Sequence, residues 1–152
     1  MWIGLLWYFN FVQGEYFKEA EASAKSDAIR KLVPRALWWF RWGSLVTWLS
    51  GAAALGHYRI FADAFTLGLL GDSLNIQAMV IGVGAWLGTI MLFNVWVFIW
   101  PNQKKVLGIV KASAEEVARA KRVAFLASRT NTMLSVPMLM SMVGYGHGGF
   151  FL

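Results

Sequence analysis

Residues 86–105 read WLGTIMLFNVWVFIWPNQKK, an apolar run that contains Asn94 and ends abruptly at Pro101 and a polar segment with two lysines. The uncharged stretch around it extends from Ala78 to Trp100. At about 1.5 Å per residue, a helix of this length crosses a hydrocarbon core of about 30 Å. The sequence therefore predicts a membrane-spanning helix with an asparagine inside it.

The rest of the chain has the same character. Hydrophobic residues make up 58% of the 152 residues, charged residues make up 14%, and the mean hydropathy is +0.52. Further apolar runs occupy residues 130–152, 42–58 and 1–14. Soluble domains are less apolar and contain about 25% charged residues. We therefore expect an all-α integral membrane protein with a single membrane domain over residues 1–152. Its four transmembrane helices are expected at about 1–33, 36–58, 77–100 and 114–152, the last with a cytoplasmic portion.

The lysines and arginines predict how the helices are oriented. Most of them lie in residues 18–35 and 104–129, whereas residues 59–77 contain Arg59 alone. Basic connections face the cytoplasm, so both termini and the middle connection are expected outside. The net charge of +6 then reflects topology, with membrane lipid and not nucleic acid as the partner. The expected location is the bacterial inner membrane, with multiple passes.

Local patterns predict how the two basic segments fold. The first segment contains two oppositely charged i,i+4 pairs, Glu21 with Lys25 and Asp27 with Lys31, which favour a helix. The second contains Ser113 followed three residues later by Glu116, the spacing of a capping box. A helix is expected to begin there and to lead directly into the last membrane helix.

The first and third predicted helices look like copies of one another. Four residues recur at identical spacing: Trp2, Gly4, Phe9 and Asn10 as Trp86, Gly88, Phe93 and Asn94. A shift of 90 residues also aligns Gly146 and His147 with Gly56 and His57. Although apolar sequences also repeat by chance, both halves follow the same out-in-out course. We interpret residues 1–58 and 78–152 as halves of a pseudo-twofold four-helix bundle, related by an axis along the membrane normal.

His57 and His147 are the only histidines in the chain, and the predicted topology places both on the outer side. Two imidazoles facing each other across a bundle are suitable axial ligands of a haem b iron. Small residues before His57 would leave room for the porphyrin. Two alternatives stay open, namely interfacial histidines without a ligand, and a site for another metal or pigment. Because the sequence contains no cysteine, covalent attachment of a c-type haem is excluded.

Other candidate residues are polar or small. For Asn10 and Asn94, an interhelical hydrogen bond is favoured over contact with a substrate or quinone. Gly84 and Gly88 have the Gly-x-x-x-Gly spacing that lets another helix approach closely. Arg41 is expected near the inner surface, where it binds a lipid headgroup or lines an inner anion site.

Three segments carry a resemblance to a known family: PRALWWFRWGSLVTWLSG (34–51), LGTIMLFNVWVFIWPNQKK (87–105) and SRTNTMLSVPMLMSMV (128–143). They resemble the membrane domain of the bacterial membrane-bound urate oxidase (urate hydroxylase) family. The positions that match the family's pattern are Gly88, Thr89, Asn94, Pro101, Asn102, Gln103, Asn131, Pro137 and His147. In that family a cytochrome c domain commonly follows the membrane domain and accepts electrons. This sequence has no Cys-x-x-Cys-His motif, so the resemblance implies a separate cytochrome.

The sequence therefore favours a small membrane subunit of an electron-transfer or oxidoreductase system, with one haem b between His57 and His147. Its partners would be other membrane subunits, or a separate cytochrome or quinone. One alternative is a structural or assembly subunit without a cofactor. Another is the membrane component of a urate hydroxylase that works with a separate cytochrome c. No catalytic residue can be assigned from the sequence.

Overall fold

The computed structural model describes residues 1–147, and every regular element in that range is helical, which confirms the all-α class. The predicted fourth helix extends to residue 152, and its last residues lie outside the described range. The elements are α1 (Trp2–Trp7), π-helical η1 (Tyr8–Gln13), α2 (Gly14–Glu19), α3 (Ala22–Lys31), α4 (Val33–His57), α5 (Phe61–Phe65), α6 (Ile76–Phe93), π-helical η2 (Asn94–Ile99), α7 (Trp100–Val106) and α8 (Ala114–Gly146).

The helices form two compact units. Unit 1 comprises residues 1–45 and 93–132, and unit 2 comprises residues 46–92 and the described residues from 133 onward. Each unit is therefore assembled from both predicted repeat halves. The helices α4 and α8 contribute residues to both units.

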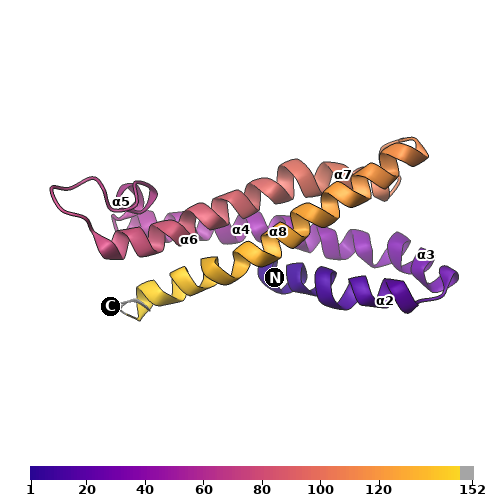
Figure 1. Ribbon diagram of the computed structural model, residues 1–152, viewed down its shortest axis with the longest axis horizontal. Coiled ribbons are helices and arrows are strands. Elements are labelled where there is room, and N and C mark those ends of the chain that lie inside the picture. Colours follow the sequence, from indigo (N-terminus) through magenta and orange to yellow (C-terminus); the bar gives the residue numbers. More distant parts are fainter. Residues whose placement is uncertain (148–152) are drawn as a thin grey trace. The chain divides into compact units, whose positions relative to one another are not determined.

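The first predicted helix, over residues 1–33, is interrupted. α1, η1 and α2 follow one another without a break, but Ala20 is extended, with ψ of 140°. α3 then runs back in the opposite direction (Figure 1). Lys25 Nζ donates to the Phe17 carbonyl at 3.0 Å, and this contact takes the place of the predicted pair with Glu21. The predicted pair of Asp27 and Lys31 does form, at 2.8 Å, and its hydrogen bond lowers the pKa of Asp27.

The third predicted helix is longer than its apolar run. α6, η2 and α7 form one helical run, Ile76–Val106, which is the one helix among the described residues that is long and apolar enough to cross a membrane. It continues through Pro101, the second residue of α7, although proline has no N–H to donate to the preceding turn. The run ends before Gly108, whose φ of +73° favours glycine.

The predicted capping box is confirmed at the start of α8. The Ser113 N–H donates to Glu116 Oε2 at 2.9 Å, and the Glu116 N–H donates to Ser113 Oγ at 3.2 Å. Lys105 Nζ lies 3.7 Å from the other carboxylate oxygen. The backbone hydrogen bond, together with the positive charge, lowers the pKa of Glu116. From this cap, α8 continues through Pro137 to Gly146.

In unit 2, α5 lies very close to α6. Ala64 is fully buried, and a Cβ added to Gly82 would lie 2.1 Å from its carbonyl oxygen. Trp86 Nε1 donates to the Phe65 carbonyl at 3.0 Å. The backbone of α5 can approach α6 this closely only because residue 82 is glycine.

Candidate functional site

Polar side chains are buried and large apolar side chains are exposed on the long helices. Ser44, Asn131 and Ser135 are fully buried, and Asn10 is nearly so. Soluble proteins rarely show this arrangement, since their charged and polar groups face water. The exposed apolar residues include Trp38, Trp39, Val46 and Leu49 on α4, Val83, Ile90 and Phe93 on α6, Val97 on η2, and Leu126, Met133, Val136 and Leu139 on α8.

Both predicted asparagines make interhelical hydrogen bonds in unit 1. Asn10, in η1, donates to Ser128 Oγ of α8 at 2.7 Å and to the Leu6 carbonyl at 2.8 Å. Asn94, the first residue of η2, donates to Asn131 Oδ1 of α8 at 2.9 Å. Each asparagine therefore attaches a π-helical turn to α8. Such π-helical turns within α-helices occur frequently at functional sites.

Arg41 lies in a cluster of tryptophans in unit 1. Its guanidinium carbon is 3.7 Å from the centre of the Trp100 ring, 5.4 Å from that of Trp96 and 5.7 Å from that of Trp42. Arg41 Nε and Trp96 Nε1 are buried donors without a hydrogen-bond partner. The stacked guanidinium is held by cation–π contact, and the predicted lipid or anion contact stays a prediction.

The two glycines of the Gly-x-x-x-Gly pattern have different surroundings. A Cβ on Gly84 would lie 3.1 Å from Ser141 Oγ of α8, whereas a Cβ on Gly88 would have nothing within 4 Å. Ser141 Oγ accepts from the Gly84 N–H at 3.0 Å and donates to the Val80 carbonyl. The hydroxyl thus contacts two backbone groups of α6 that are four residues apart. Close approach of another helix occurs at Gly84.

The two histidines lie near the ends of their helices in unit 2, and both are exposed. The His57 ring is in edge contact with Tyr58, at 5.5 Å between ring centres. His147 Nδ1 lies 3.0 Å from the Val143 carbonyl oxygen. Since a carbonyl only accepts, Nδ1 is the donor in this contact. Among the described residues, no hydrogen bond or ring contact joins the two histidines, and no group of three metal-ligating side chains occurs.

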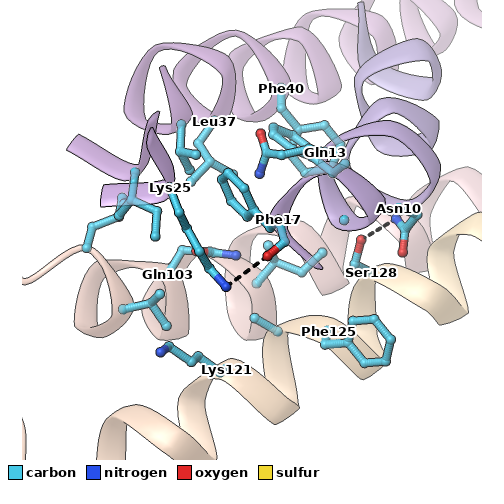
Figure 2. A pocket seen from close by; sticks show the side chains of 18 residues that line it. Asn10, Gln13, Phe17, Lys25, Leu37, Phe40, Gln103, Lys121, Phe125 and Ser128 are labelled. Atoms are coloured by element: carbon cyan, nitrogen blue, oxygen red, sulfur yellow. Dashed lines mark hydrogen bonds between the residues drawn. The ribbon is translucent and has the colours of Figure 1, made fainter. Parts of the chain in front are cut away.

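A cavity of about 380 Å³ lies in unit 1, between η1, α2, α3, α4, η2, α7 and α8. Its polar lining comes from Asn10 and Gln13 of η1, Gln103 of α7, Ser128 of α8, and two lysines, Lys25 and Lys121. Figure 2 shows the two lysine amines on one side of the cavity and the Asn10–Ser128 pair on the other. This volume falls within the range of about 300–1,000 Å³ that is typical of small-molecule sites.

The cavity lining is positively charged and partly aromatic. No aspartate or glutamate is among the described residues that line it, while four phenylalanine rings are: Phe9, Phe17, Phe40 and Phe125. The Gln13 Oε1 atom is buried without a hydrogen-bond partner. An unpaired buried acceptor is unfavourable.

The urate oxidase N-terminal family model matches residues 68–151, which is more than half of the chain. The chain belongs to the urate oxidase N-terminal family. No curated protein and no solved structure matches it. The resemblance predicted from the sequence is thereby confirmed. The family match covers both Asn94 and Asn131, which are hydrogen-bonded to each other.

The region that matches the urate oxidase N-terminal family model includes part of the cavity lining. Gln103, Lys121, Phe125 and Ser128 fall inside it, and the residues from η1, α2, α3 and α4 fall outside. Sequence reasoning did not identify the cavity. Gln103 offered a signal, because it belongs to the Pro-Asn-Gln segment that carries the resemblance. Gln13 offered none, since its place depends on how α3 folds back.

Proposed function

We propose that this chain is the membrane component of a urate-oxidising electron-transfer system. The family match over residues 68–151 is the observation that carries the proposal. Membrane placement is supported by the helical run Ile76–Val106 and by the burial of Asn131 and Ser135 beneath exposed apolar side chains. In lipid, apolar side chains face outward and polar groups pair between helices. The proposal includes several passes through the bacterial inner membrane.

The proposed reaction requires an electron acceptor. In a hydroxylation, urate gains one oxygen atom from water and releases two electrons and two protons. Residues 1–152 contain no cysteine, so they cannot attach a c-type haem to take those electrons. The proposed acceptor is a separate one-electron cytochrome, which is reduced twice for each urate, or a membrane quinone, which is reduced once.

The test uses the purified full chain in lipid nanodiscs with urate and ferric cytochrome c. The expected result is a urate-dependent rise in reduced cytochrome, with two equivalents formed per urate consumed. Samples without urate or without the chain serve as controls. A folded preparation that reduces neither the cytochrome nor an added quinone would overturn the proposal and leave a structural or assembly subunit as the better interpretation.

We further propose that His57 and His147 hold one haem b. The observation in favour is the contact between His147 Nδ1 and the Val143 carbonyl. Metal-bound histidines commonly donate their second ring nitrogen to a carbonyl or carboxylate, which directs the other nitrogen to the metal. A bound haem would supply one-electron transfer, and the chain would contribute the two imidazole ligands.

An absorption spectrum of the full chain tests the haem proposal, after purification and after addition of haem b. The expected result is a reduced b-type band that disappears in both His57→Ala and His147→Ala. Tyr58→Phe is the matched control, because it alters the neighbour of His57 and leaves both imidazoles. Absence of the band from the folded protein, or its persistence in both histidine variants, would refute the assignment.

A further inference from the structure

We propose that Arg41, Lys104 and the tryptophans around them bind the phosphate of an anionic phospholipid in the membrane leaflet that faces the cytoplasm. All of these residues belong to unit 1. The proposal rests on the proposed function in one respect, the placement of the chain in a membrane. The sequence pointed to Arg41 alone, and the structure adds Lys104 and the ring that the two cations share.

Two cations lie beside one aromatic ring. The guanidinium carbon of Arg41 is 3.7 Å from the centre of the Trp100 ring, and Lys104 Nζ is 5.8 Å from the same centre. Like charges beside one ring repel each other. Cation–π contact offsets only part of the cost of taking a cation out of water. The two groups are therefore stabilised by a nearby anion.

The two helices that carry these cations supply no such anion. Neither α4 nor the run Ile76–Val106 contains an aspartate or a glutamate. Among residues 1–147, no ion pair includes Arg41 or Lys104, and the one carboxylate paired with α7 is that of Glu116, which lies beside Lys105. An anion from outside the protein would balance the pair.

The Arg41 guanidinium keeps two nitrogens for this anion. The side chain is half-buried, and of its nitrogens only Nε is enclosed without a partner. The two terminal nitrogens donate to no described residue and are not enclosed, so an external group can reach them. Together they form a planar fork that fits two oxygens of one phosphate. The amine of Lys104 ends a flexible stem and can approach the same phosphate.

The surrounding tryptophans favour a lipid over a dissolved anion. Trp38, Trp39 and Trp42 of α4 are exposed by 48%, 53% and 40%, and ring contacts connect them to Trp96. Tryptophans gather at the level of the headgroups in membrane interfaces. A dissolved phosphate or urate ion would leave the three exposed rings in water, whereas a phospholipid covers them with its acyl chains.

The lack of carboxylates also favours an anionic headgroup over a zwitterionic one. Phosphatidylethanolamine and phosphatidylcholine carry a cationic nitrogen beside the phosphate. That nitrogen would lie near Arg41 and Lys104, with no carboxylate on either helix to attract it. Phosphatidylglycerol has hydroxyl groups in its place, so its single negative charge is left to the two cations.

The experiment measures binding of dioleoyl phosphatidylglycerol to the purified full chain in a neutral detergent by native mass spectrometry. Arg41→Gln is expected to raise Kd about ten-fold and Lys104→Gln about five-fold. Arg41→Lys keeps the charge and loses the fork, so it should raise Kd about three-fold. Arg35→Gln and Lys111→Gln, at exposed positions, are the matched controls and should bind as the unaltered chain does. Dioleoyl phosphatidylcholine should bind the unaltered chain about ten-fold more weakly.

Each result decides the proposal. Weaker binding in the Arg41 and Lys104 variants, with unchanged thermal unfolding and unchanged controls, supports it. If Arg41→Gln does not fold, Lys104→Gln and the lipid preference of the unaltered chain give the answer. Equal affinity for the two lipids, or equal affinity in all folded variants, would overturn the proposal. Release of phosphatidylglycerol by inorganic phosphate or urate, but not by sodium chloride at the same ionic strength, would also overturn it and assign the cations to a dissolved anion.

Failure of this site is distinguishable from failure of the proposed function. Urate-dependent cytochrome reduction by a chain that shows no preference for phosphatidylglycerol refutes only the lipid site. A preference for phosphatidylglycerol that depends on Arg41 and Lys104, in a chain that reduces neither cytochrome nor quinone, refutes only the function.

Discussion

The hydrogen bond between Asn94 and Asn131 should stabilise the fold measurably, and a double-mutant cycle isolates its contribution. The donor–acceptor distance is 2.9 Å, and Asn131 is fully buried. Interhelical hydrogen bonds in membrane proteins contribute about 0.6 kcal/mol on average and at most about 1.7 kcal/mol. Because one partner is fully buried and the distance is short, we expect a coupling energy of about 1 kcal/mol.

The two single substitutions should differ in how much they lower the free energy of unfolding. Asn131→Ala removes the bond and leaves a void in a fully buried position, which we expect to cost about 2 kcal/mol. Asn94→Ala, at a half-buried position, should cost about 1 kcal/mol. The double variant should therefore be less destabilised than the sum of the two by about 1 kcal/mol.

Unfolding in mixed micelles of dodecyl maltoside and SDS, followed by the fluorescence of the nine tryptophans, measures these free energies. Asn102→Ala provides the matched control, since Asn102 donates to the Phe98 carbonyl of its own helical run at 2.7 Å. Its cycle with Asn131→Ala should be additive. A coupling below about 0.3 kcal/mol for Asn94 and Asn131, which is the usual error of additivity, would refute the reasoning.

Two further predictions concern the glycines and the cap of α8. Gly82→Ala should destabilise the chain by about 1–3 kcal/mol, because its Cβ would lie 2.1 Å from the Ala64 carbonyl oxygen. Gly88→Ala should be neutral or stabilising by about 0.5–1 kcal/mol, since nothing lies within 4 Å of its Cβ. The same unfolding assay measures both free energies, and equal effects of the two substitutions would contradict this prediction. The pKa of Glu116 is lowered from its ordinary value of 4.5. The ionised carboxylate therefore stabilises the α8 N-terminus above about pH 4.5, and this stabilisation is lost as the pH falls through the lower folded value. The loss of far-ultraviolet helical signal from pH 6 to pH 3 should be smaller in Glu116→Gln than in the unaltered chain, and the control Glu115→Gln should behave as the unaltered chain does.

The features that the sequence predicted are those fixed by local chemistry. The capping box needs only Ser113 and Glu116 at the right spacing, and it forms as expected. The long helix was predicted from its uncharged run over residues 77–100, and the structure confirms a helix there that continues through Pro101 to Val106. Such patterns depend on neighbours within one or two turns, which the sequence contains.

The features that the sequence did not reveal depend on contacts between distant segments. Gly82 was not singled out, because its importance comes from the Ala64 carbonyl of a separate short helix. The cavity likewise requires α3 to fold back at Ala20, where the backbone becomes extended, although the residues around Ala20 favour a helix. Lys25 then contacts Phe17 in place of Glu21. Tertiary contacts of this kind override local preference and leave little trace in the sequence.

The asparagine contacts in unit 1 bear on the predicted internal duplication. Under a strict twofold axis, the hydrogen-bond partners of Asn10 and Asn94 would lie on two different helices, one in each half. Both partners instead lie on α8, at Ser128 and Asn131. The 90-residue shift that aligns His147 with His57 places Asn131 on Arg41. Arg41 stacks on Trp96 and Trp100, which lie in the same helical run as Asn94. If the halves are copies, the two equivalent positions both contact the third predicted helix, one through an amide and the other through a guanidinium. A twofold axis exchanges the first and third predicted helices, so the symmetry copy of the Asn131 contact would join position 41 to the first predicted helix. The contacts of Arg41 and Asn131 with the third helix are therefore not copies of each other, and the duplication stays a prediction from the sequence.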